Sequence, residues 1–110
     1  MKDYLVVLIT VPNKKEAGKI ARILVEKKLV ACINIVPEIT SIYHWQGKIE
    51  KSKELLLLIK SKKNLFRRLL EEVKKIHSYT VPEIIALNIE KGYKPYLDWI
   101  GNSVRQISGK

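Results

Sequence analysis

The side chains best suited to chemistry lie in one short segment, His77-Ser78-Tyr79-Thr80-Val81-Pro82-Glu83. It places an imidazole, a phenol and a carboxylate close together along the chain. A neutral imidazole binds copper or zinc well, and the carboxylate of Glu83 could supply a harder oxygen ligand. Because a predicted helix ends here, His77 has a second interpretation, in which it caps helix carbonyls or packs at an interface. Tyr79 and Pro82 are interpreted as structural.

Two further sites contain side chains that could bind a metal. In Tyr43-His44-Trp45, strand alternation sends the two aromatic rings to one face and His44 to the other. We interpret the rings as interface packing and His44 as a solvent-exposed side chain, with surface metal binding as the alternative. Cys32 lies among apolar strand residues, where a thiol usually behaves as a small buried hydrophobe; its alternative role is that of a soft-metal ligand.

The sequence contains no recognised catalytic motif. It has two histidines and one cysteine, and no Ser or Asp stands in an elbow-like or triad-like setting. Its five glycines are scattered, so no glycine-rich loop precedes a helix. We therefore expect a binding protein and not an enzyme.

Composition limits the possible partners and location. The 110 residues predict one small domain, and no apolar run approaches the length of a membrane span. The N-terminal run is too short for a signal peptide, so we expect a cytoplasmic protein. The net charge of +10 is spread over both halves, as +4 in residues 1–55 and +6 in residues 56–110. The basic cluster at residues 60–75 contains carboxylates at helical spacing; this favours a solvated helix face over a phosphate-binding stripe, and we expect no nucleic acid partner.

Hydrophobic periodicity predicts an α+β domain spanning residues 1–110. A buried strand at residues 4–11 is followed by a helix capped by Asn13 and ending near Lys28. Two long extended segments, residues 29–45 and 48–60, flank the turn Gln46-Gly47. A helix capped by Ser61 and running to His77, an extended segment at residues 81–89 and a helix opening at Tyr93 complete the chain. This order is that of a ferredoxin-like split βαβ sandwich with helices on one sheet face.

The predicted hairpin is longer than such a domain requires. Arms of about 14 residues extend roughly 45 Å, so the far end must project beyond the rest of the subunit. The projecting part contains apolar residues that no helix of the same chain can cover: Ile39, Ile42, Tyr43, Trp45 and Ile49. A second copy is the natural cover, and pairing the hairpin edges in a closed ring removes them as sites of aggregation. We expect a cyclic homo-oligomer.

Four blocks of residues resemble the CutA family of divalent-cation-tolerance proteins. They are Leu29 to Pro37, Thr40 to Glu50, His77 to Ile85 and Tyr96 to Trp99, and they cover essentially the whole chain in order. The resemblance implies a homotrimer built around long hairpins, similar to the PII signalling proteins, whose clefts between subunits bind small ligands. It also implies the residues of that cleft: Tyr43, Trp45, Lys60, His77, Tyr79 and Glu83.

The same resemblance implies a function in metal tolerance without a required enzymatic activity. Members described as copper-binding have a cysteine and two histidines at positions that here are Ile9, Ile76 and His77, so this chain keeps one of the three ligands. We expect a trimer that binds Cu(II) or another divalent cation, with His77 and Glu83 as metal ligands and no metal needed for folding. The alternative is a PII-like sensor that binds a small anionic metabolite in the cleft through Lys60 and His77.

Overall fold

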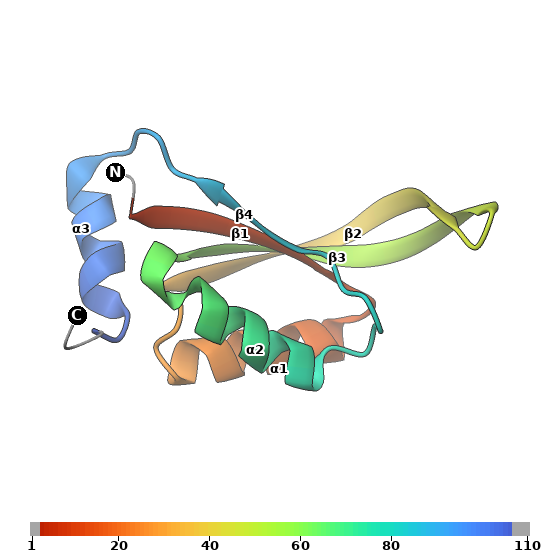
Figure 1. Ribbon diagram of the computed structural model, residues 1–110, viewed down its shortest axis with the longest axis horizontal. Coiled ribbons are helices and arrows are strands. Elements are labelled where there is room, and N and C mark those ends of the chain that lie inside the picture. Colours follow the sequence, from red (N-terminus) through yellow and green to blue (C-terminus); the bar gives the residue numbers. More distant parts are fainter. Residues whose placement is uncertain (1–2, 107–110) are drawn as a thin grey trace.

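The computed structural model describes residues 3–106 and has the predicted α+β fold (Figure 1). Its four-stranded antiparallel sheet has the order β2-β3-β1-β4, which is that of a split βαβ sandwich. The elements are β1 (Tyr4–Val11), α1 (Lys14–Glu26), β2 (Cys32–Trp45), β3 (Lys48–Lys62), the 3₁₀ turn η1 (Lys63–Leu65), α2 (Phe66–Ile76), β4 (Ile84–Asn88) and α3 (Lys94–Ser103). Among residues 3–106 no helix is long and apolar enough to cross a membrane.

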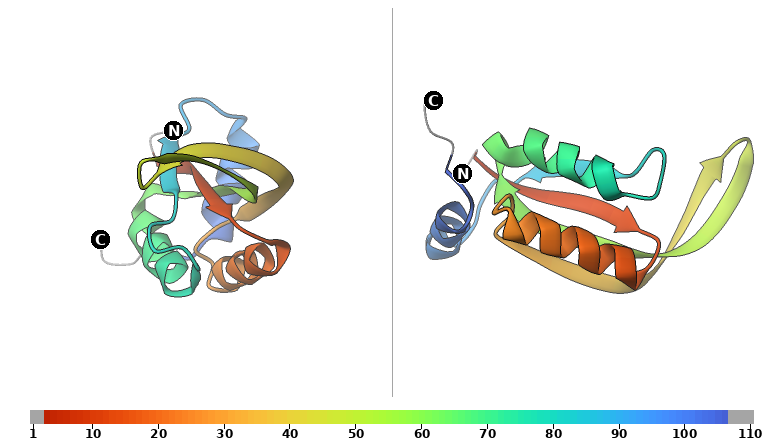
Figure 2. Two further views of the ribbon diagram at one scale, coloured as in Figure 1. Left: turned by 90° about the vertical axis from the view of Figure 1, so that its right-hand side faces the viewer. Right: turned by 90° about the horizontal axis from the view of Figure 1, so that it is seen from below.

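Helices α1 and α2 cover one face of the sheet, as Figure 2 shows from below. The core lies between these layers because alternate residues of β1 and β3, such as Val7 and Ile59, point toward the helices and are fully buried. Asn13 caps α1 as predicted, since its Oδ1 accepts a hydrogen bond of 2.8 Å from the amide of Glu16. Helix α3 lies at the end of the sheet away from the hairpin tip (Figure 1).

The opposite face of the sheet has no helix of α1 or α2 over it and is apolar. We call it the open face. Its apolar residues alternate with the core residues along each strand and lie beside one another on neighbouring strands. They are Leu56 and Leu58 on β3, Val6 and Leu8 on β1, and Ile85 and Leu87 on β4. Ile85 and Leu87 are 48% and 54% exposed. A continuous apolar face of this kind on an isolated chain marks an association surface.

The hairpin of β2 and β3 projects beyond the rest of the subunit (Figure 1), and the molecule is 46 Å long. Its turn at Gln46 and Gly47 has positive φ at both residues, 52° and 79°, as a type I′ turn requires. A bulge between Val36 and Ile39 bends β2. The predicted apolar patch is present in part, because Ile42 and Ile49 are exposed whereas Ile39 is half-buried.

Two local predictions are wrong. Ser61 does not cap a helix: it belongs to β3, is buried, and donates a 2.6 Å hydrogen bond from Oγ to the carbonyl of Leu29. The pairing of β3 with β1 extends past Ser61. Helix α2 therefore begins only at Phe66, after the turn η1. Residues 81–83 are not part of a strand, because β4 begins at Ile84, where its pairing with β1 begins.

Candidate functional site

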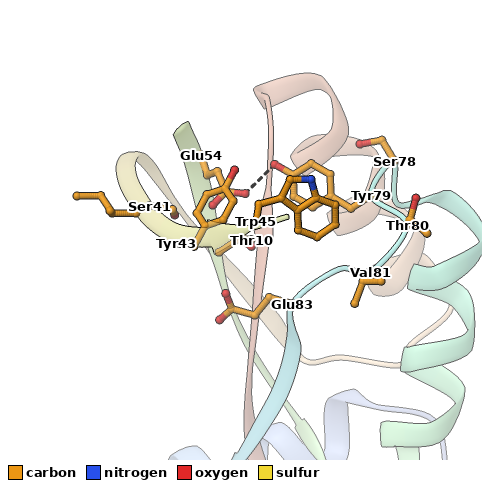
Figure 3. Close-up of a pocket in the computed structure, with 11 residues that line it drawn as sticks. Thr10, Ser41, Tyr43, Trp45, Glu54, Ser78, Tyr79, Thr80, Val81 and Glu83 are labelled. Atoms are coloured by element: carbon orange, nitrogen blue, oxygen red, sulfur yellow. Dashed lines mark hydrogen bonds between the residues drawn. The ribbon is translucent and has the colours of Figure 1, made fainter. Parts of the chain in front are cut away.

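A cavity of about 710 Å³ lies on the open-face side of the sheet, at the base of the hairpin (Figure 3). The part of β2 beyond its bulge and the segment 78–83 form two of its walls. The residues that line it are Thr10, Ser41, Ile42, Tyr43, Trp45, Glu54, Ser78, Tyr79, Thr80, Val81 and Glu83. Thr10 and Glu54 have the strand parity of Leu8 and Leu58, so the cavity is continuous with the open face.

Glu54 and Tyr79 form the polar contact at the bottom of this cavity (Figure 3). The Tyr79 hydroxyl donates to Glu54 Oε2 at 2.7 Å, and Glu54 is 6% exposed. Burial of the phenol, and then the adjacent Glu54 carboxylate, raise the pKa of Tyr79 well above its usual value. Tyr79 therefore remains a hydrogen-bond donor at neutral pH and orients the carboxylate.

His77 lies just outside the cavity and is buried. Its Nε2 is 2.8 Å from the Thr10 carbonyl, which can only accept, so Nε2 carries the proton. Its Nδ1 accepts a 3.1 Å hydrogen bond from the amide of Tyr79. The side chain is fully buried, and both ring nitrogens are engaged by these two backbone groups. His77 therefore holds the Tyr79 backbone in place, and neither of its ring nitrogens has a free lone pair for a metal.

Glu16 completes this arrangement from α1. Although Asn13 and Glu16 have the spacing of a capping box, the Glu16 carboxylate instead accepts from the amide of Ser78 at 2.9 Å. The same oxygen is 3.3 Å from His77 Nδ1. Sequence analysis missed Glu16 as a residue that positions the site, because its partners lie more than sixty positions away.

Four of the six predicted cleft residues line the cavity, namely Tyr43, Trp45, Tyr79 and Glu83. Lys60 and His77 do not. Lys60 lies elsewhere on the open face, opposite Cys32 in the β2·β3 ladder, and its ammonium donates to the Asn34 side chain. The predicted anion site at Lys60 and His77 is therefore not assembled within one chain.

The metal-binding side chains are dispersed. Among residues 3–106 no three His, Cys, Asp or Glu side chains converge on a possible metal position. Cys32 is half-buried beside Tyr96, whose pKa is raised by burial and by its contact with Cys32. His44 is exposed on the hairpin, and Glu83 is exposed at the cavity. The side chains of one chain do not fit a resident copper ion, and the predicted His77–Glu83 site stays a prediction.

Comparison with known sequences gives a consistent family match. The family described as "CutA1 divalent ion tolerance protein" matches residues 5–103. A divalent-cation tolerance protein CutA from Thermus thermophilus is 56% identical over 95 residues, which cover 86% of this chain and 92% of that protein. The human protein CutA is 47% identical over 91% of this chain, which spans 56% of the length of that relative.

Solved structures agree with the sequence matches. The divalent cation tolerance protein of Thermus thermophilus has a TM-score of 0.91 at 52% identity, covering 93% of this chain and 99% of that one. CutA1 from Oryza sativa has a TM-score of 0.92 at 46% identity, covering 96% of each chain. The Archaeoglobus fulgidus relative, at TM-score 0.90, 45% identity and coverage of 93% and 99%, is described as periplasmic. Cytoplasmic location of this chain therefore stays a prediction.

Proposed function

The chain belongs to the CutA1 divalent ion tolerance protein family, and from this we propose that it is a non-enzymatic homotrimer that helps the cell tolerate divalent cations. The observation that carries the proposal is the family match over residues 5–103. The cavity at the hairpin base is its ligand site. Trimerisation turns this cavity into a cleft between subunits, because it adjoins the open face.

The open face and the hairpin support assembly of several copies. Ile85 and Leu87 expose about half of their surface in the isolated chain. Ile49 on the hairpin, which does not line the cavity, is 72% exposed. Covering these groups with a second copy removes apolar surface from water at about 25 cal/mol per Å², and closed cyclic symmetry leaves no strand edge free.

The metal is held by oxygen ligands in this proposal. Glu83 is exposed and adjoins the open face, so other subunits can complete its coordination. His77 has both nitrogens occupied, which removes the imidazole that would favour copper. We expect modest affinity for divalent ions, including Cu(II), and binding that requires the assembled trimer.

Two substitutions with the same exposure test the assembly. Ile85 on the open face is 48% exposed and Val25 on α1 is 47% exposed. Light scattering should give a trimer mass for the wild type and for Val25→Lys, and a smaller mass for Ile85→Lys, because a desolvated ammonium at a packed interface costs several kcal/mol. A trimer mass for Ile85→Lys, or a monomer mass for the wild type at micromolar concentration, would contradict the proposal.

Calorimetric titration with CuCl₂, ZnCl₂ and MnCl₂ tests metal binding. We expect saturable heat for the wild type and a loss of about tenfold or more in affinity for Glu83→Gln, which keeps the shape of the side chain and removes its charge. Glu90→Gln, at another exposed position on the segment that follows β4, is the matched control. Absence of saturable heat with all three salts would refute direct metal binding.

A further inference from the structure

The charged side chains that line the cavity are both carboxylates, Glu54 and Glu83. Lysine, arginine and histidine are absent from its lining within the described residues 3–106. This is notable because the whole chain carries a net charge of +10. The cavity is thus an acidic region on a basic protein, and its electrostatics attract a cation and repel an anionic metabolite.

Glu54 is suited to interact with a ligand in addition to Tyr79. It is more than nine-tenths buried, and Oε2 is the oxygen that the Tyr79 hydroxyl contacts. Within residues 3–106 its Oε1 oxygen has no hydrogen-bond donor, and because no buried side-chain oxygen there lacks a partner, Oε1 is open to the cavity. A carboxylate buried to this degree interacts with a cation far more strongly than one in bulk water, because the local dielectric is low.

Three aromatic rings line the same cavity. Tyr43 and Trp45 extend from β2, and Tyr79 extends from the segment between α2 and β4 (Figure 3). Glu54 lies in β3 and Glu83 immediately precedes β4, so the carboxylates and the rings reach the space from different parts of the chain. Aromatic faces attract ammonium groups, Trp most strongly, and they also pack against the carbon atoms of an organic ligand.

From this combination we infer that the cavity binds a small organic ammonium compound, with its cationic nitrogen near Glu54 and against the rings of Trp45, Tyr43 or Tyr79. A hydrated metal ion gains little from aromatic walls, whereas an alkylammonium is weakly hydrated and apolar around its charge. A volume of about 710 Å³ is enough for a whole small molecule. The inference rests on the proposed function in taking this cavity as the ligand site, but it does not require that a metal binds.

The test compares choline with 3,3-dimethylbutan-1-ol, a neutral compound of the same shape in which carbon replaces nitrogen. Calorimetric titration of the metal-free full-length protein should give saturable heat with choline and at least tenfold weaker binding of the alcohol. Inorganic phosphate should not bind. Equal affinity for choline and the alcohol, or no saturable heat with choline, would overturn the inference.

Variants locate the binding. Glu54→Gln keeps an oxygen that can accept from Tyr79 but removes the charge, and Trp45→Leu removes the strongest aromatic face; each should weaken choline binding at least tenfold. His44→Gln is the control, because alternation places His44 on the other hairpin face from Tyr43 and Trp45. Light scattering confirms that each variant keeps the wild-type mass. Unchanged choline affinity in Glu54→Gln would contradict the assignment.

Two further titrations separate the possible outcomes. Nα-acetyl-lysine amide presents an ammonium as a protein side chain would, and tighter binding of this compound than of choline would overturn the assignment to a free small molecule. Titration with MnCl₂ and CuCl₂ tests the proposed metal function independently. Choline binding without metal binding would support this inference and refute metal binding; metal binding without choline binding would do the reverse.

Discussion

Replacing His77 by leucine tests whether this residue positions the cavity wall or binds metal. In the structure the ring donates through Nε2 to the Thr10 carbonyl at 2.8 Å and accepts through Nδ1 from the Tyr79 amide at 3.1 Å. His77→Leu removes both bonds and introduces an apolar side chain of similar size. The Thr10 carbonyl and the Tyr79 amide then lose their partner in a region where the His77 side chain is fully buried.

The magnitude follows from these two backbone groups. A buried donor or acceptor left without a partner costs about 1–3 kcal/mol, and two such groups predict a loss of about 2–6 kcal/mol in the free energy of unfolding. His77→Gln should recover part of this loss, about 1 kcal/mol, because a glutamine amide can still donate to the Thr10 carbonyl. The order of stability is therefore wild type, His77→Gln, His77→Leu.

Guanidinium unfolding at one fixed protein concentration measures these differences, since the stability of an oligomer depends on concentration. The control is His44→Leu, which changes the exposed histidine and should shift stability by less than about 0.5 kcal/mol. Equal unfolding midpoints for His77→Leu and wild type would refute the positioning role. A folded His77→Leu trimer that loses all saturable Cu(II) binding would instead support His77 as a metal ligand.

Three further substitutions test parts of the fold that hold the site. Asn13→Ala removes the cap of α1 and should lower the free energy of unfolding by about 1 kcal/mol in the same denaturation assay. Gly47→Ala places a Cβ at φ 79° in the hairpin turn and should cost about 1 kcal/mol; an unchanged midpoint would contradict the turn geometry. The raised pKa of the Tyr79 phenol means that stability is intact below the ordinary tyrosine pKa of about 10 and falls as pH rises above it. Tyr79→Phe should reduce this alkaline decline, and an identical pH profile would show that Tyr79 is not protonated preferentially in the folded chain.

Most of the fold could be predicted from the sequence because periodicity reports burial directly. The near-continuous apolar run of β1 predicts a central strand, and the helical spacing of α2 identifies its buried face without knowledge of the partners. Ser61 shows where this reasoning fails. Serine before a helical pattern is a good cap, yet here β3 continues through Ser61 because β1 supplies a pairing partner as far as Lys62. A tertiary partner therefore overrode a local preference.

The site was predicted less completely, since its geometry depends on contacts between distant segments. Alternation placed Tyr43 and Trp45 on one face of the hairpin, and Tyr79 and Glu83 share one polar segment. The family resemblance, however, is what predicted that all four belong to one cleft. Glu54 was missed, although it is a carboxylate immediately before the apolar run of β3, where it shares strand parity with Leu56 and Leu58. Sequence alone does not show that segment 78–83 closes over that position and buries it.

The polar residues of the segment 77–83 divide into those that hold the cavity wall and those that are free to meet a ligand. His77 holds the Tyr79 amide, Glu16 holds the Ser78 amide, and the Tyr79 hydroxyl binds Glu54 across the cavity. These groups connect α1, β1 and β3 to a segment without regular secondary structure, so their hydrogen bonds set its position. The groups that remain free to contact a ligand are the aromatic faces, Glu83 and the Oε1 oxygen of Glu54. This division leaves a cavity that recognises the charge and shape of a ligand. It also explains why His77, which in the sequence suggests a metal site, acts in the fold as a support for the cavity wall.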